Sequence, residues 1–160
     1  MKTKNHGYDY LIDMLIVMGY VTREQVINSR RKTPKGTSVV SQMLTEKVIT
    51  PTALTSTMAA HFGCEMVCLR KAKRQEIPDG VIATIPAVLA RKYRVIPLEK
   101  NEIGLKVAIG NPFNLATIDS LVHLLGQDIT IVVATEADIF WALNRFYPEN
   151  PKRKNWWRRK

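Results

Sequence analysis

Residues 95–134 constrain the fold most, because strand, turn and helix signals follow one another there without a break. The short apolar run 95–98 is followed by the polar, glycine-ended segment 100–104 and by a second apolar run, 105–109. Two β-rich runs joined by a polar turn that contains glycine are typical of a β-hairpin. The sequence therefore predicts two strands connected by a turn over residues 95–109.

A helix and a third strand complete the same stretch. From Leu115 onward, apolar residues recur at offsets 0, 3, 6, 7 and 10, which is the spacing of an amphipathic helix. Asn114 can cap its start, and Gly126 is placed to end it in the left-handed conformation. The almost wholly apolar run 129–133 predicts a strand that is buried on both faces. None of the junctions carries a reactive group, so this stretch is a scaffold.

The N-terminal part contains a repeat. Shifting the chain by 28 residues superposes Leu11 on Val39, Leu15 on Met43 and Ile16 on Leu44. In the first copy, the Thr22–Gln25 spacing predicts a capping box at the start of its second helix. Each copy is too small to bury its apolar face alone. The repeat therefore predicts two helical hairpins packed into one small helical subdomain over residues 8–63.

The rest of the chain predicts a second subdomain over residues 64–148. A strand is expected at 65–69, with Cys64, Met66 and Cys68 on one face and the cysteines serving in packing. A helical stretch from Asp79, the hairpin, the amphipathic helix, the third strand and a last helix follow. The predicted fold class is α+β: the helical subdomain, then a small two-layer α/β subdomain in the order β-α-β-β-α-β-α. A ferredoxin-like strand order is one possibility.

Charge is concentrated at the C-terminus. The chain has 160 residues and a formal net charge of +10, and residues 149–160 are expected to form a disordered basic tail. Without the last ten residues the charge is only mildly basic. Two tryptophans between basic residues suit an anionic membrane surface and also a nucleic acid. The candidate contacts are Lys152, Arg153, Lys154, Trp156, Trp157, Arg158, Arg159 and Lys160.

The sequence carries no pattern typical of an enzyme. A phosphate-binding loop of the Gly-x-x-x-x-Gly-Lys-Ser/Thr type is absent, the three histidines stand alone, and two cysteines lack a second ligand pair for zinc. We therefore expect no catalytic activity, no metal and no cofactor. A cytoplasmic protein is the simplest expectation, because no apolar run approaches the length of a membrane span and cysteines are few.

A family resemblance rests on several segments in a defined order. Residues 11–26 and 39–54 share one helical pattern, and the segments 61–63, 90–98 and 145–147 follow in order. Together they resemble the N-terminal domain of type II secretion and type IV pilus assembly ATPases, the general secretory pathway protein E N-terminal domain family, over nearly all of residues 8–148. The resemblance implies a docking or regulatory module for a membrane-anchored secretion or pilus component. Without the motor domain, the module is expected to stand alone.

In part of that family, the two helical motifs bind cyclic di-GMP, and each begins Arg-Leu-Gly and ends in Gln. At the corresponding positions this sequence has Tyr10-Leu11-Ile12 with Thr33, and Ser38-Val39-Val40 with His61. The arginines, glycines and glutamines are therefore missing while the apolar framework remains, so we expect cyclic dinucleotide binding to be weak or lost. The positions of this degenerate motif are Tyr10, Leu11, Leu15, Ile16, Ser38, Val39, Met43, Leu44 and His61.

Three functions therefore follow from the sequence, in order of preference. The first is a non-catalytic protein-interaction module, located in the cytoplasm or peripherally at the inner face of the membrane. The second is a cyclic di-GMP receptor with degenerate motifs. The third is a nucleic-acid-binding protein that acts through its basic tail.

Overall fold

The computed structural model describes residues 6–70 and 77–149, which form two units that separate between Phe62 and Gly63. Within these residues the chain forms eight helices and one three-stranded sheet, which confirms the predicted α+β class. Each unit is described by itself below. None of the helices α1–α8 in the described ranges has both the length and the apolar character that crossing a bilayer requires.

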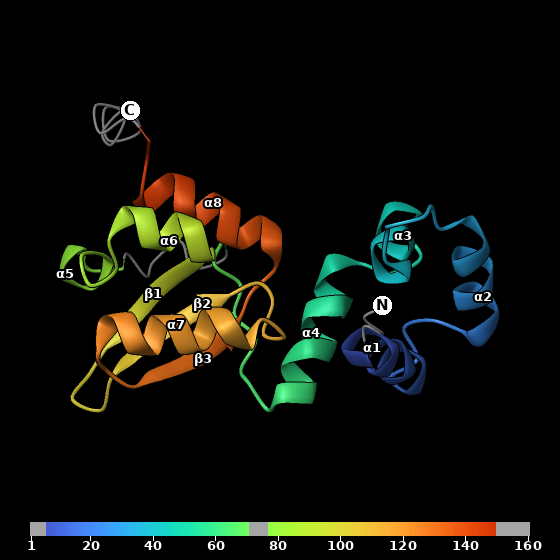
Figure 1. Ribbon diagram of the computed structural model, residues 1–160, viewed down its shortest axis with the longest axis horizontal. Coiled ribbons are helices and arrows are strands. Elements are labelled where there is room, and N and C mark those ends of the chain that lie inside the picture. The colour runs from blue at the N-terminus through green and yellow to red at the C-terminus, as the bar shows by residue number, and fades with distance from the viewer. Residues whose placement is uncertain (1–5, 71–76, 150–160) are drawn as a thin grey trace. The chain divides into compact units, whose positions relative to one another are not determined.

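Unit 1 consists of four helices (Figure 1): α1 (His6–Val17), α2 (Arg23–Lys32), α3 (Val39–Thr45) and α4 (Pro51–Phe62). The main contacts pair α1 with α4 and α2 with α3. The two copies of the repeat therefore pack across one another, and not chiefly as two self-contained hairpins. This pairing brings the first helix of the first copy against the last helix of the second.

Local sequence explains where these helices begin. The predicted capping box is present, because the Thr22 side chain accepts from the Gln25 backbone N–H and the Gln25 side chain accepts from that of Thr22. Ser38 caps α3 through its side chain alone, since its hydroxyl oxygen accepts the Ser41 N–H at 3.0 Å. Each bond satisfies an N–H group that the first helical turn leaves without a partner.

A polar contact joins α2 to α3. The hydroxyl of buried Ser29 donates to a carboxylate oxygen of Glu46 at 2.7 Å, and Lys32 lies 3.2 Å from the other oxygen. The hydrogen bond from Ser29 lowers the pKa of Glu46. Since Ser29 comes from the first copy of the repeat and Glu46 from the second, this contact helps to hold the copies together.

Unit 2 is built around the sheet (Figure 1). Its elements are α5 (Asp79–Ile82), α6 (Ala87–Tyr93), β1 (Val95–Lys100), β2 (Leu105–Ile109), α7 (Leu115–Leu125), β3 (Ile129–Val133) and α8 (Glu136–Phe146). The strand order is β1-β2-β3, with β1 antiparallel and β3 parallel to β2. Helix α7 connects the directly adjacent strands β2 and β3, so the order is not ferredoxin-like, in which another strand separates the two.

The predicted strand over residues 65–69 is reduced to one parallel bridge. Met66 pairs with Val133, and the Val67 N–H donates to the Val133 carbonyl at 2.9 Å. Cys64 is half-buried and Cys68 is exposed, so the expectation that both cysteines serve in packing is wrong for Cys68. The segment nevertheless extends the sheet locally beyond β3.

The core of unit 2 lies between the sheet and its helices. Val95, Ile96, Val107 and Ile139 are all at most 1% exposed. Strand β3 is buried only in its second half, because Ile129 and Ile131 are half-buried and Thr130 is exposed. The predicted burial of β3 on both faces is therefore wrong at its start.

Three apolar residues that lie on helices beside buried positions are exposed. These are Ile27 on α2, Val122 on α7 and Phe140 on α8, with 51%, 39% and 66% of their surface accessible. In each case a neighbour in the stripe takes the buried position, as Ile139 does beside Phe140. Apolar spacing gives the face of a helix, but the width of the buried stripe depends on what packs against it.

The end of α8 is tied to the two short helices. The Tyr147 hydroxyl donates to the Ile82 carbonyl at 2.8 Å, and burial raises the pKa of this phenol. The Arg91 guanidinium donates to the Tyr147 carbonyl through both Nε and Nη2. The chain therefore leaves α8 from a fixed point beside α6.

We expect Gly104→Ala to destabilise unit 2, because a Cβ atom at this position would lie 2.2 Å from the backbone oxygen of Asp128. That oxygen accepts the Leu105 N–H at 2.9 Å, so it cannot move without cost. Overpacking of this kind costs about 1–3 kcal/mol. The midpoint of urea denaturation measures the loss.

Gly80→Ala is the matched control, since an added Cβ there meets nothing within 4 Å and Gly80 lies in a helix. It should leave the stability unchanged or raise it by up to about 1 kcal/mol. Equal midpoints for the two variants would contradict the close approach at Gly104.

Candidate functional site

The apolar framework of the helical motif is intact in unit 1. Leu11, Leu15 and Met43 are each at most 1% exposed. The remaining apolar motif positions, which are half-buried, are Ile16, Val39 and Leu44. These residues hold the helices together and offer no polar group to a ligand.

The positions expected to carry polar or small ligand-binding residues are used internally. Ile12 and Val40, which stand in the place of glycine, are 5% and 3% exposed and belong to the core. Ser38 caps α3, and the Thr33 hydroxyl donates to the Ser29 carbonyl at 2.7 Å. Each of these side chains therefore has a structural role in unit 1.

The pairing of α1 with α4 places the start of one motif copy beside the end of the other. The rings of Tyr10 and His61 have centroids 4.9 Å apart, and the His61 ring meets Phe62 edge-on at 4.7 Å. Tyr10 remains 55% exposed. The sequence marks Tyr10 and His61 as motif positions but does not predict that they lie together. A 28-residue repeat carries no information about which helices pack against each other.

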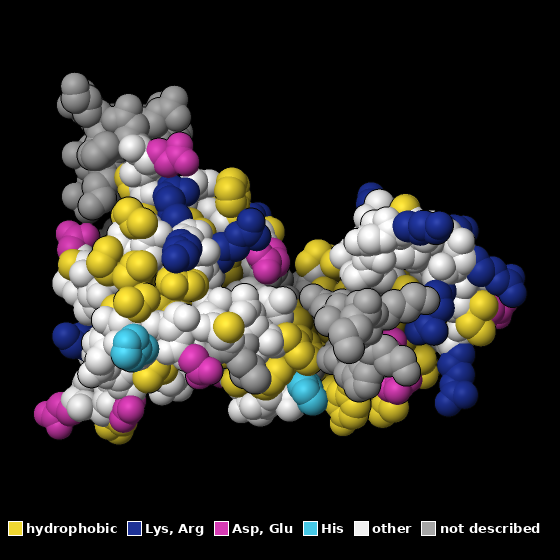
Figure 2. Space-filling view, viewed as in Figure 1, with side chains coloured by type: hydrophobic (Ala, Val, Ile, Leu, Met, Phe, Trp, Pro, Cys, Tyr) yellow, Lys and Arg dark blue, Asp and Glu magenta, His cyan; other side chains and the backbone are white. Residues whose placement is uncertain are grey.

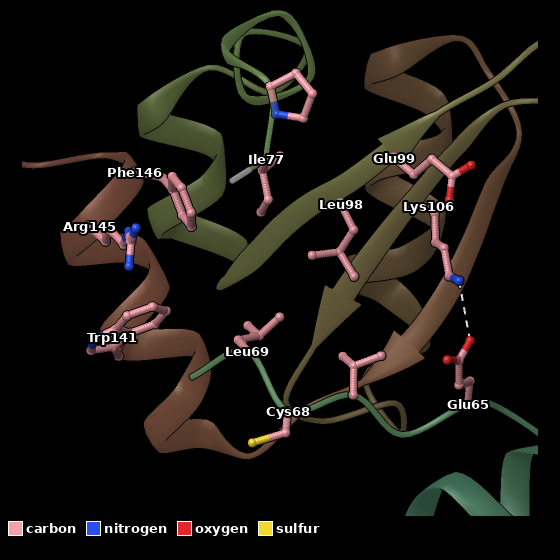
Figure 3. Close-up of a pocket in the computed structure, with 12 residues that line it drawn as sticks. Glu65, Cys68, Leu69, Ile77, Leu98, Glu99, Lys106, Trp141, Arg145 and Phe146 are labelled. Carbon is pink, nitrogen blue, oxygen red and sulfur yellow. Dashed lines mark hydrogen bonds and ion pairs between the residues drawn. The ribbon is translucent and has the colours of Figure 1, made fainter. Parts of the chain in front are cut away.

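Unit 2 contains a pocket of about 440 Å³, drawn in Figure 3. Helix α8 provides one wall through Trp141 and Phe146, and Leu98 of β1 faces them from the sheet. Leu69 and Ile77 contribute further apolar surface. The volume lies in the range of sites that hold a small molecule or an inserted side chain.

The rim of this pocket is polar. Lys106 Nζ lies 3.2 Å from Glu65 Oε2, and Glu99 lines the same side (Figure 3). On the opposite side, the Arg145 guanidinium lies 5.2 Å from the Trp141 ring centroid and 5.5 Å from that of Phe146. An apolar interior with charged groups at its edge suits a partly apolar ligand.

Asp138 fixes one wall of the pocket. Its carboxylate, on a residue only 6% exposed, accepts the Leu69 backbone N–H at 3.0 Å and lies 3.2 Å from Arg70 Nε. In sequence, Asp138 is only an acidic residue in the first turn of α8. Its bond to a residue 69 positions earlier has no local sequence signal.

The described residues contain no cluster of three His, Cys, Asp or Glu side chains that could hold a metal ion.

The thirteen basic and thirteen acidic side chains of the described residues balance. By composition, the excess positive charge therefore belongs to residues 1–5, 71–76 and 150–160. Without the last ten residues the chain keeps 18 basic against 14 acidic residues, and this remaining excess lies in residues 1–5 and 71–76. Figure 2 shows the mixed pattern over α6 and α8, where Arg91 and Arg94 lie within 4.0 Å of Glu149 and Glu136.

The tail positions lie outside the described residues. Contact of Lys152, Trp156, Trp157 and their basic neighbours with a membrane or polyanion therefore stays a prediction from sequence.

Comparison with known families identifies unit 2. The model of the MshEN domain matches residues 62–152, more than half of the chain. The chain therefore belongs to the MshEN domain family. The matched segment begins at the boundary of unit 2, so the helical repeat of unit 1 lies almost wholly outside it.

Curated relatives place this module in larger proteins. The chain is 26% identical over 138 residues to the type IV pilus assembly ATPase PilB of Myxococcus xanthus, covering 86% of this chain and 24% of PilB. It is 24% identical over 127 residues to bacteriophage adsorption protein B of Escherichia coli K12, covering 79% of this chain and 17% of that protein. The chain thus spans a quarter or less of these relatives.

Solved structures share the fold. A structure of MshE with cdg (cyclic di-GMP) matches with a TM-score of 0.71 and 21% identity, covering 86% of this chain and 98% of that one. The N-terminal domain of XpsE matches with a TM-score of 0.69 and 14% identity, covering 92% and 99%. These likenesses show the fold, and together with the MshEN domain match and the match to a pilus assembly ATPase they confirm the predicted resemblance to N-terminal domains of secretion and pilus ATPases.

We expect Asp138→Ala to lower the free energy of unfolding by about 1–3 kcal/mol, because the Leu69 N–H loses its acceptor. Asp138→Asn is the matched control. Its amide oxygen can still accept that N–H, and the lost pairing with the half-exposed Arg70 is worth at most about 1 kcal/mol. Urea denaturation of both variants measures the difference, and equal losses would show that the hydrogen bond to Leu69 is not what matters.

Proposed function

We propose that this chain is a non-catalytic docking module that binds a protein component of a type IV pilus or type II secretion system. The main support is that the apolar motif positions of unit 1 are packed in its interior, while the positions expected to bind a ligand have structural roles. Ile12 and Val40 are buried, and Ser38 caps a helix. Because these positions offer no polar group to a ligand, a protein partner suits unit 1 better than a charged small molecule.

The relatives support a role other than nucleotide hydrolysis. This type of module matches part of a pilus assembly ATPase and also part of a bacteriophage adsorption protein. A module shared by proteins with such different names is expected to contribute binding or regulation. The sequence also lacks a phosphate-binding loop of the Walker type.

The second candidate is a cyclic dinucleotide receptor, favoured by the structural likeness to MshE with cdg. Against it stands the absence of an arginine at both motif starts, where Tyr10 and Ser38 are found instead. A guanidinium can form paired, charge-assisted hydrogen bonds to phosphate, each stronger than a neutral one. We therefore rank this function second.

We expect cyclic di-GMP to bind weakly or not at all, and titration calorimetry at moderate salt measures this. The double change Tyr10→Arg with Ser38→Arg places an arginine at the start of each helical motif. It should also cost about 1 kcal/mol of stability through loss of the Ser38 cap. A submicromolar dissociation constant with defined stoichiometry for the unmodified chain would reverse the ranking of the two functions.

The exposed apolar end of α1 is the surface on which docking is best tested. Val17 is 86% exposed, and Met18 and Tyr20 are each 41% exposed. Exposed apolar side chains grouped in this way are typical of protein contacts. The partner expected here is an apolar segment of a pilus or secretion protein.

We expect a photo-crosslinking amino acid at Val17, introduced into the chain in its own host, to capture a pilus or secretion component identified by mass spectrometry. The matched control is Val88 on α6, which is 77% exposed. The same adducts from both positions, or adducts only with unrelated proteins, would contradict docking through this surface.

A further inference from the structure

The pocket of unit 2 has no part in the function proposed above. Its interior is formed by Leu69, Leu98 and Phe146, and Trp141 stands beside them (Figure 3). Flat aromatic side chains pack well against such walls, because stacked and edge-on ring contacts add to the burial of apolar area. The pocket is therefore suited to an aromatic side chain.

The chain itself carries such side chains a few residues after the pocket wall in sequence. Helix α8 ends at Phe146, which belongs to the pocket wall, and Arg91 holds the next carbonyl in place. Trp156 follows Phe146 by ten residues. An extended chain spans about 3.3–3.6 Å per residue, so this length is sufficient to return to the pocket.

Composition singles out the same two residues. Within residues 150–160, Trp156 and Trp157 are the only large apolar side chains, and six of the others are Lys or Arg. The pocket rim carries the carboxylates of Glu65 and Glu99. Glu99 has no ion-pair partner among the described residues, so it can accept a basic neighbour of the tryptophans.

We propose that Trp156 and Trp157 of this chain occupy the pocket between α8, β1 and residues 65–69, with a basic neighbour at Glu99. Covalent attachment gives the tail an effective concentration in the millimolar range, so even weak affinity for the pocket suffices. The occupied state conceals the tryptophans. An anionic membrane would have to compete with the pocket for them.

Disulfide trapping in the full-length chain tests this proposal. Cys68 lies at the pocket and is exposed, and Cys64→Ser leaves it as the sole native thiol. Asn155→Cys adds a second thiol beside the tryptophans without changing them. We expect an intramolecular disulfide between positions 68 and 155, followed on non-reducing gels and by mass spectrometry in a glutathione buffer.

The matched control moves the acceptor thiol to α7, which contributes no residue to the pocket. This variant carries Cys64→Ser, Cys68→Ser and Leu124→Cys together with Asn155→Cys, and Leu124 is 52% exposed. Disulfide formation at Cys68 should be about tenfold faster or more than at position 124, since docking raises the local thiol concentration. Adding Trp156→Ser and Trp157→Ser should remove this advantage.

Equal rates at positions 68 and 124, or rates unaffected by loss of the tryptophans, would overturn the proposal. A disulfide found only between two chains would also overturn it in favour of a second copy as the occupant. Loss of the disulfide on adding anionic vesicles, but not neutral ones, would support competition between pocket and membrane.

Discussion

The buried carboxylate of Asp138 is the contact on which the arrangement of unit 2 most depends. It binds the Leu69 N–H and the Arg70 guanidinium, and so holds the segment after Gly63 against α8. The same segment pairs with the end of β3 through Met66. The Asp138 carboxylate therefore fixes both the segment that extends the sheet and the Leu69 wall of the pocket, because it accepts a backbone N–H from a residue far away in sequence.

In unit 1 the apolar positions of the repeat form the core, while the other motif positions have structural roles. Leu11, Leu15 and Met43 remain in the core. The contacts α1–α4 and α2–α3 join the copies, and they bring Tyr10 against His61. The other motif positions serve as a helix cap, core residues and ring contacts, which is why we favour a protein partner over a nucleotide.

Charge is distributed differently from what a net value of +10 suggests. The described residues are balanced, and pairs such as Lys106–Glu65 and Arg94–Glu136 mix the two signs on the surface of unit 2. Attraction to an anionic partner would therefore depend on the segments that hold the excess. Competition between the pocket and an anionic surface for the two C-terminal tryptophans would then connect charge to the state of unit 2.

The sequence alone determined the class of fold, the family resemblance and the helix ends. The capping box at Thr22, the Asn114 cap and the left-handed Gly126 are local, because each requires only residues within one or two turns. Only the tertiary structure decided which helices pair, that Phe140 is exposed, and that Asp138 binds Leu69. The pocket likewise joins residues 65 to 146, and periodicity along one element carries no information about contacts between elements so distant in the chain.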